Sequence, residues 1–223
     1  MNICIVAGHT TTGKGTGAVG YINESTENRI LAKKVTEYIK KAGHNCGYYE
    51  INKSDTYLKD QVDFANKKAY DVVVQIHFNA GGGIGTETLY RSASGKKYAN
   101  QINKKLSTMF KDRGAKHDIN DVGRKLYWLG NTKAPAVLIE TCFVDSKVDT
   151  DKYINNKDAI AKLIAEGIIG DNIQDKPIEV SKNENNDILW GVYVGAYKDK
   201  EKANALVEEL KKKGYTSTYL IPR

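Results

Sequence analysis

Three short runs of apolar, mostly β-branched residues each lead into a polar side chain, and this repeated pattern constrains the fold most. The runs cover residues 3–7, 72–76 and 136–139, and the polar residues that follow them are His9, His77 and Glu140. Runs this short and this β-branched are typical of strands buried on both faces of a parallel sheet. Because ligands bind at the carboxyl ends of such strands, we expect the three side chains to converge at one sheet edge.

Segments with helical periodicity separate these strands. Apolar stripes predict helices over residues 24–42, 57–68, 96–113 and 157–169. Further strands are expected over 45–51 and 85–91 and a short one over 126–129, whereas 115–124 is expected to be irregular. The alternation of strands and helices predicts an α/β fold with a mostly parallel sheet flanked by helices on both faces.

The predicted α/β domain ends near residue 170, and the rest of the chain differs in character. Residues 171–187 have no periodicity and are rich in Asn, Asp and Glu, which predicts a linker. Residues 188–223 predict a small β-α-β unit with its helix over 201–213. Because units below about 40 residues seldom fold alone, we expect either a homodimer that pairs two copies of 188–223 or docking of the unit on its own chain.

Charge, cysteine number and hydropathy limit the partners and the location to be expected. The 223 residues carry a formal net charge of +7, which favours polyanionic partners such as nucleic acid, anionic lipid or wall polymers, although a solvated lysine-rich surface explains it equally well. The 3 cysteines are odd in number and lie in or beside apolar runs, so we interpret them as small buried hydrophobes. For Cys142, two residues past Glu140, a thiolate nucleophile or zinc ligand is the less favoured alternative. No apolar run approaches the roughly 20 residues of a membrane span. The first residues enter a strand directly, so we expect no signal peptide and a soluble product that is cytoplasmic at synthesis.

The polar residues at the strand ends suit metal-assisted hydrolysis. Two histidines and one carboxylate hold zinc in catalytic sites whose fourth position stays open. A further carboxylate outside the metal shell can transfer protons. His9, His77, Glu24 and Glu140 fill these roles, although spacing alone favours Glu24 as a first-turn acid that complements the helix dipole. The glycine-rich segment 13–17 lacks the spacing of a phosphate-binding loop and is expected to be an active-site loop.

At these residues the chain resembles the zinc-dependent N-acetylmuramoyl-L-alanine amidases of the type 3 family, which cleave peptidoglycan. The matching segments occur in the family's order and are 7–9, 23–24 with Asn28, 65–66, 76–79 and 135–140. The resemblance implies that His9, Glu24 and His77 hold Zn²⁺ and that Glu140 is the catalytic carboxylate, which reverses the interpretation of Glu24. Gln75 and Thr141 stand where the family usually has Ser and Gly, and both are expected to alter the pocket wall.

The resemblance also implies a substrate and a place of action. The expected reaction is hydrolysis of the amide between N-acetylmuramic acid and L-alanine in the bacterial cell wall, with peptidoglycan as partner and neither nucleic acid binding nor membrane insertion. The expected lack of a leader fits a phage endolysin, similar to those of clostridial phages, better than a secreted autolysin. Residues 188–223 resemble half of a SPOR-type wall-binding domain, with 192–197 matching its first strand.

Two other functions fit the same residues. A zinc carboxypeptidase acting on wall peptides would need a cation to anchor the free carboxylate of its substrate, and Arg91 and Arg124 are the candidates. A non-catalytic protein that binds walls or nucleic acid would use only the positive charge. Metal content separates the enzymes from the binding protein.

His117 and Asp118 are expected to be ordinary loop residues.

Overall fold

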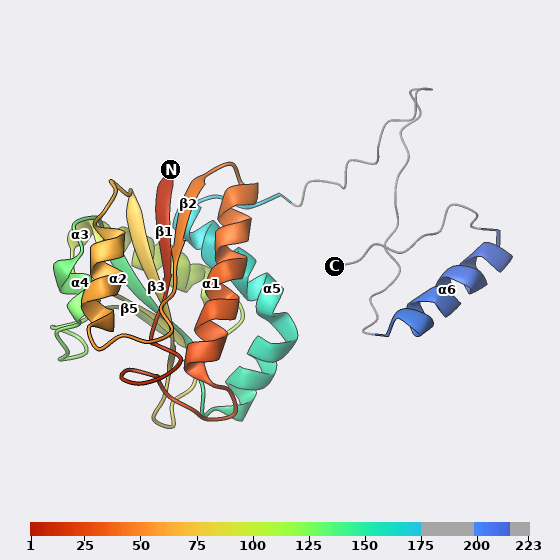
Figure 1. Cartoon of the computed structure of the whole chain (residues 1–223), viewed down its shortest axis with the longest axis horizontal. Helices are drawn as coiled ribbons and strands as arrows, with labels where there is room; N and C mark the ends of the chain where they lie inside the picture. The colour runs from red at the N-terminus through yellow and green to blue at the C-terminus, as the bar shows by residue number, and fades with distance from the viewer. Residues whose placement is uncertain (175–198, 215–223) are drawn as a thin grey trace. The chain divides into compact units, whose positions relative to one another are not determined.

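The computed structural model describes residues 1–174 and 199–214, and the chain divides into two units, 1–174 and 175–223. The first unit is built on a six-stranded sheet in the order β2-β1-β3-β6-β4-β5 (Figure 1). The strands are β1 (Asn2–Ala7), β2 (Asn45–Tyr49), β3 (Val72–Asn79), β4 (Thr86–Tyr90), β5 (Asp112–His117) and β6 (Ala136–Phe143). The helices of this unit are α1 (Glu24–Lys41), α2 (Tyr57–Ala65), α3 (Ala93–Leu106), α4 (Tyr127–Asn131) and α5 (Lys147–Ile169).

The sheet is mostly parallel, as the sequence predicts. β1 pairs in parallel with β2 and β3, β3 with β6, and β4 with β5. The exception is β4, which runs antiparallel to β6 and places Glu87 opposite Glu140. On the other side of β6, the parallel register places His77 beside Glu140. Glu140 therefore lies between two polar residues of neighbouring strands.

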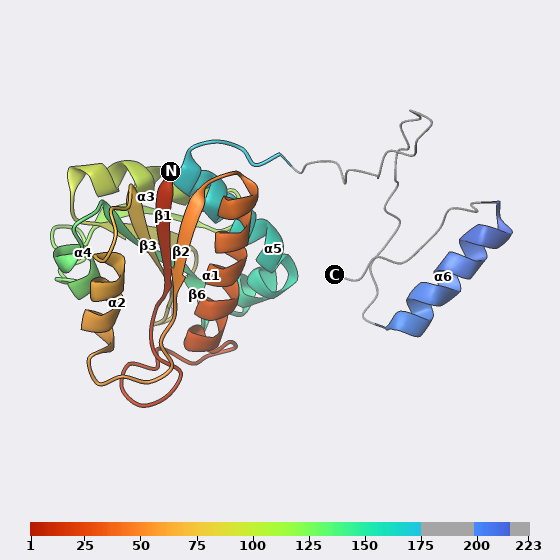
Figure 2. The same cartoon turned by 45° about the horizontal axis from the view of Figure 1, so that its top comes forward.

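Helices cover both faces of the sheet, which confirms the predicted architecture. Helices α1 and α5 lie on one side of the strands and α2 and α4 on the other (Figure 2). Side chains alternate between the faces of a strand. In β1, Ile3 and Ile5 join the core under α1, α3 and α5, whereas Cys4 and Val6 join the smaller core under α2 and α4. The central strands are apolar on both faces because both faces are covered.

The prediction for residues 96–124 was wrong in two places. Helix α3 ends at Leu106 rather than at 113, and residues 112–117, assigned partly to that helix and partly to an irregular segment, form β5. β5 is the edge strand beside β4 and has no fully buried residue, so its sequence carries no apolar alternation. Gly114 within it adopts a positive φ of 86°.

Two further elements differ from the sequence prediction, one in its type and one in where it begins. The short strand expected over 126–129 is instead helix α4, in which Trp128 is buried and donates a hydrogen bond from Nε1 to the carbonyl of Val137 at 3.0 Å. Helix α5 begins at Lys147, capped by Ser146, rather than at 157. A kink at Asn156 interrupts its helical dihedral angles. The apolar periodicity after the kink is therefore the clearer signal in the sequence.

The described part of the second unit is helix α6 (Lys200–Lys212), which confirms the helix expected there. Asp199 caps its first turn by accepting a hydrogen bond from the amide of Glu201 at 2.8 Å. The strands expected in 188–196 and 216–221, and the linker from residue 175 on, lie outside the described residues. Across residues 1–174 and 199–214, no helix has the length and apolar character that a membrane crossing requires.

Asp149 ties the loop before β4 to β6 and gives a test of this packing. Its buried Oδ2 accepts hydrogen bonds from the amides of Gly85 at 2.8 Å and Phe143 at 3.1 Å. Because an unsatisfied buried donor costs about 1–3 kcal/mol, we expect Asp149→Ala to lower the free energy of unfolding in urea by about 2–5 kcal/mol. The control Asp151→Ala removes only an exposed ion pair with Lys147 and should change it by under ~0.5 kcal/mol. Equal losses in the two variants would contradict this role.

Candidate metal and catalytic site

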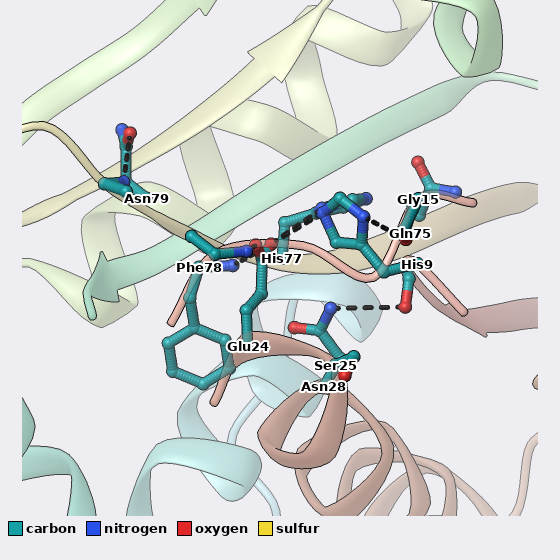
Figure 3. Close-up of polar contacts among 12 residues, drawn as sticks. His9, Gly15, Glu24, Ser25, Asn28, Gln75, His77, Phe78 and Asn79 are labelled. Carbon is teal, nitrogen blue, oxygen red and sulfur yellow. Dashed lines mark hydrogen bonds and ion pairs between the residues drawn. The ribbon is translucent and has the colours of Figure 1, made fainter. Parts of the chain in front are cut away.

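Three side chains from separate segments meet at the carboxyl ends of β1 and β3 (Figure 3). His9 lies two residues past the end of β1, His77 lies near the end of β3, and Glu24 is the first residue of α1. The side chain of Asn23 caps α1 by accepting from the amide of Thr26 at 3.1 Å, which fixes where the helix begins and so where Glu24 points. One ligand atom from each of the three residues lies within 4.8 Å of the others.

The Glu24 carboxylate is the centre of this cluster. Its Oε1 lies 3.1 Å from Nε2 of His9 and 3.0 Å from Nδ1 of His77, and it accepts from the amide of Phe78 at 3.1 Å. Its Oε2 accepts from the amide of Ala18 at 2.9 Å. Burial opposes ionisation, but hydrogen bonds and charge from His77 and His9 outweigh burial and hold the pKa of Glu24 well below its ordinary value. The side chain therefore has a ligand's geometry and charge in addition to its place near the helix dipole.

The backbone at His9 is unusual, because its φ of 62° is the only positive value at a non-glycine residue in the described ranges. Such conformations cost of order 1–3 kcal/mol and persist when surrounding contacts enforce them. Here the carbonyl of His9 accepts from Nη2 of Arg29 at 3.1 Å, and its ring Nδ1 lies 2.8 Å from the carbonyl of Gly15. The contacts aim the other ring nitrogen at Glu24.

Arg29 is a supporting residue that the sequence analysis missed. Its buried guanidinium also donates to the carbonyls of Ser25 at 2.5 Å and Ile51 at 2.6 Å. Arg29 thus joins α1 to the segment that follows β1 and to the segment that follows β2. Nothing in the sequence distinguishes it from the many other cations of α1, because its partners are backbone carbonyls from distant segments.

Two glycines allow the close approach of the histidines. A Cβ on Gly8 would lie 2.3 Å from Nε2 of His77, and one on Gly17 would lie 2.8 Å from Oε2 of Glu24. Gly17 also has a positive φ of 76°. The glycine-rich loop therefore wraps the cluster at close range, as expected for an active-site loop, and contributes the backbone groups of Gly15 and Ala18 to it.

The tautomer of His9 tests whether a metal ion fits these residues. The Gly15 carbonyl can only accept, so Nδ1 of His9 donates to it and Nε2 faces the Glu24 carboxylate at 3.1 Å. A neutral His9 ring in this orientation would place the lone pair of Nε2 beside a carboxylate oxygen, and a metal ion bound by both atoms would suit that pairing. Burial lowers the pKa of His77 despite its hydrogen bond to Glu24, which favours the neutral ring that a metal requires. Two imidazoles and a carboxylate, one imidazole oriented by a carbonyl, match the donor set of catalytic zinc sites.

Glu140 lies on β6 beside the cluster and is 8% exposed. Burial raises its pKa to about 8, with the negative charges of Glu24 and Glu87 adding to the effect and Arg124 opposing it. Its Oε2 is buried and has no hydrogen-bond partner within the described part of the chain. A carboxyl group that holds a proton near neutral pH and has a free oxygen suits proton transfer.

Glu87 is a second residue that the sequence analysis missed, because only the antiparallel pairing of β4 brings it to Glu140. Its carboxylate accepts from Asn79 at 2.9 Å, Arg113 at 2.9 Å and Lys116 at 2.6 Å. Burial opposes its ionisation, but the two cations hold the pKa of Glu87 below its ordinary value. It remains charged beside Glu140 and raises the cost of ionising that residue.

A pocket of about 410 Å³ opens beside Glu140, and neither His9 nor His77 lines it. Its wall is formed by the ends of β3, β4 and β6, the glycine-rich turn after β3, and the loop after β5. The charged and polar residues that line it are Asn79, Glu87, Arg113, Arg124 and Glu140. The arrangement offers a space for a substrate on one side of Glu140 and the metal-capable cluster on the other.

The other candidates from the sequence fall outside this chemistry. Arg91 is held by Asp118 through both carboxylate oxygens, and His117 lies beside the same pair. Asp118 is fully buried and closes the loop after β5, so it is a structural residue and the expectation of an ordinary loop position was wrong for it. Cys142 is buried, and burial raises the pKa of its thiol, which disfavours a thiolate nucleophile.

Comparison with known proteins gives two family matches. The profile of a family described as N-acetylmuramoyl-L-alanine amidase matches residues 3–170, and that of the SPOR domain matches residues 155–222. The two overlap in the second half of α5, whose Ile160, Ile164 and Ile168 are buried in the core of the first unit. The SPOR match thus begins earlier than the residue 188 expected from sequence.

Individual relatives agree with the first match. An uncharacterised protein of Clostridium perfringens is 36% identical over 82% of this chain and 57% of its own length. The endolysin of Bacillus phage SPP1 is 33% identical over 72% of this chain and 60% of its own length. The chain thus spans under two thirds of these relatives. The solved catalytic domain of the CD27L endolysin, which targets Clostridia Difficile, is 37% identical, with a TM-score of 0.70 over 78% of this chain and 99% of that one.

Metal analysis tests the role of Glu24. We expect about one Zn²⁺ per chain after dialysis against zinc, and Glu24→Ala and His77→Ala should lose most of it if these side chains are two of three ligands. Glu27→Ala is the matched control, since Glu27 is the other first-turn acid of α1 but binds Tyr153 and Lys157. If Glu24→Ala keeps full zinc content, Glu24 serves the helix dipole rather than the metal.

Proposed function

The chain belongs to the N-acetylmuramoyl-L-alanine amidase family, and we propose that it is a zinc hydrolase of the amide between N-acetylmuramic acid and L-alanine in bacterial peptidoglycan. The observation that carries the proposal is the juxtaposition of a His-Glu-His cluster with the buried carboxyl group of Glu140 on the adjoining strand. A metal site and a proton-transfer group at one sheet edge are the two elements that metal-assisted amide hydrolysis needs.

In this proposal, His9, Glu24 and His77 hold the zinc ion. When bound, zinc supplies positive charge that polarises a carbonyl and lowers the pKa of a water molecule to about 7. The chain keeps the ligands in place through Gly15, Arg29 and the amide of Phe78. Support for zinc rather than a harder cation comes from the two imidazole donors, because Mg²⁺ and Ca²⁺ prefer oxygen ligands.

Glu140 is the residue to which we assign proton transfer. Its free Oε2 accepts the proton of the attacking water, and the protonated carboxyl group then donates it to the leaving nitrogen of L-alanine. The raised pKa favours the second step, and positive charge at the neighbouring cluster favours the ionised form that the first step needs.

We further propose that the protein acts on cell walls as an endolysin or autolysin, with the C-terminal unit as a wall-binding module. The similarity to a phage endolysin and the SPOR match over 155–222 support this assignment.

The reaction is tested by digesting purified walls and analysing the products by mass spectrometry. Amidase activity releases intact peptides with a free N-terminal L-alanine and leaves unsubstituted glycan. A carboxypeptidase would instead release single C-terminal amino acids, and a binding protein would release nothing. Either of the last two outcomes overturns the proposed activity.

Replacing the proposed proton carrier separates chemistry from metal binding. We expect Glu140→Gln to lower kcat on purified walls by about 10²–10⁴-fold, because a general base is removed, while zinc content and the melting temperature stay near those of the unmodified chain. The control Glu166→Gln alters another buried carboxylate, one that binds Lys105 and does not line the pocket. Near-normal lysis by the Glu140 variant would remove this residue from the mechanism.

Glu87 gives a test by pH. Its negative charge contributes to the raised pKa of Glu140, so Glu87→Gln should lower that pKa. Because proton acceptance needs ionised Glu140, activity falls as pH drops below this pKa, and the acidic limb of the kcat profile should move to lower pH in the variant. The same profile for Glu50→Gln, which alters an acid outside the pocket, is the control. An unmoved or oppositely moved acidic limb would contradict the coupling.

A further inference from the structure

We propose that Arg124 determines substrate specificity by binding a free carboxylate of the peptide that departs after amide cleavage. The inference rests on the proposed amidase function and assigns the pocket beside Glu140 to the peptide side of the scissile bond. In peptidoglycan, L-alanine is followed by D-glutamate, whose α-carboxyl group is either free or amidated. Arg124 would favour the free acid.

Position supports this assignment. Arg124 lines the same pocket as Glu140, and its positive charge acts on both Glu140 and His77. A guanidinium on that wall lies within electrostatic range of both halves of the site. A substrate whose scissile amide meets Glu140 therefore extends its next residue into a pocket that contains Arg124.

Arg124 differs from the other cations near the pocket because its guanidinium is available to bind a ligand. Arg113 and Lys116 both bind Glu87, and Arg91 binds Asp118 through both carboxylate oxygens. Within residues 1–174 and 199–214, the guanidinium of Arg124 has no hydrogen bond or ion pair. Five N–H donors in a planar fork thus remain free for a carboxylate, which is the geometry that arginine recognises best.

The loop that carries Arg124 is held firmly although its side chain is free. The amide of Arg124 donates to the carbonyl of Asp118 at 2.8 Å, and the buried Asp118 carboxylate accepts from the amide of Leu126 at 3.0 Å. Arg91 closes the loop from the other side by donating to the carbonyl of Leu126 at 3.1 Å. A fixed backbone below a free guanidinium lowers the ordering cost of binding.

The charge balance of the pocket also favours an anion. Arg113 and Lys116 share the single carboxylate of Glu87, so these three side chains together carry one net positive charge. Arg124 adds a second positive charge to the pocket wall. Even with Glu140 ionised, three cations face two carboxylates there, so a net positive charge remains. An incoming carboxylate would meet net positive charge on that wall, whereas a carboxamide would gain only neutral hydrogen bonds.

The experiment compares two soluble muropeptides that differ only in a free or amidated α-carboxyl group on D-glutamate. With the full chain loaded with zinc, we expect kcat/KM to be about 10–100-fold higher for the free acid, mainly through KM, in line with the loss of one charge-assisted hydrogen-bond pair. Arg124→Gln should abolish the preference by raising KM for the acid more than for the amide, so that kcat/KM becomes equal for the two substrates. Arg124→Lys should keep part of it.

Lys125→Gln is the matched control, because it removes the exposed neighbouring cation of the same loop and should leave the preference intact. Equal cleavage of both substrates by the unmodified chain, or an equal loss on both in Arg124→Gln, would overturn the proposal. A shifted pH profile without a change in preference would assign Arg124 only to tuning Glu140 and would also overturn it.

A binding measurement separates this inference from the amidase proposal. Calorimetry with Glu140→Gln reports affinity for the two muropeptides without turnover, and we expect the free acid to bind about 10-fold or more tightly, a preference lost in the double variant with Arg124→Gln. If neither substrate is cleaved but the preference in binding remains, the proposed activity fails and the carboxylate site stands. If both substrates are cleaved and both bind equally well, the proposed amidase activity stands and the carboxylate site fails.

Discussion

The site depends on the burial of the Glu24 carboxylate. This side chain is 3% exposed, and burying a carboxylate is costly unless every oxygen is paired. The amides of Ala18 and Phe78 and the rings of His9 and His77 meet that requirement, and they come from the loop after β1 and from β3. A single charge at the start of α1 therefore joins three segments, and the two imidazoles that face it complete a donor set that suits a metal ion.

Much of this arrangement could be predicted from sequence because the signals are local. A short β-branched run followed by a polar residue predicts a buried strand, and that pattern singles out His9, His77 and Glu140, although β3 and β6 continue past His77 and Glu140. Glu24 does not, because an acid in the first turn of a helix usually complements the dipole. Its contact with two histidines arises from tertiary packing, and only the resemblance to a family indicated it.

The features that sequence reasoning missed depend on pairing or on a single contact. The direction of β4 is not encoded in its own residues, yet it decides that Glu87 faces Glu140. β5 is an edge strand without an apolar face, so no periodicity marks it. Helix α4 exists where Trp128 bonds to β6. In each case the neighbouring strand, rather than the segment itself, determines the conformation.

Glu140 lies at the boundary between two opposite electrostatic environments. On one side, Glu24 and the lone pairs of the histidines attract a cation, and on the other, the cations around Glu87 together with Arg124 attract an anion. Burial and the two neighbouring carboxylates raise its pKa, while Arg124 lowers it. Filling the first side with a metal would favour the ionised form of Glu140, and filling the second with a substrate carboxylate would cancel the charge of Arg124 and favour the protonated form. Metal and substrate thus bias Glu140 in opposite directions and would keep its pKa at an intermediate value, as a group that accepts and then donates one proton requires.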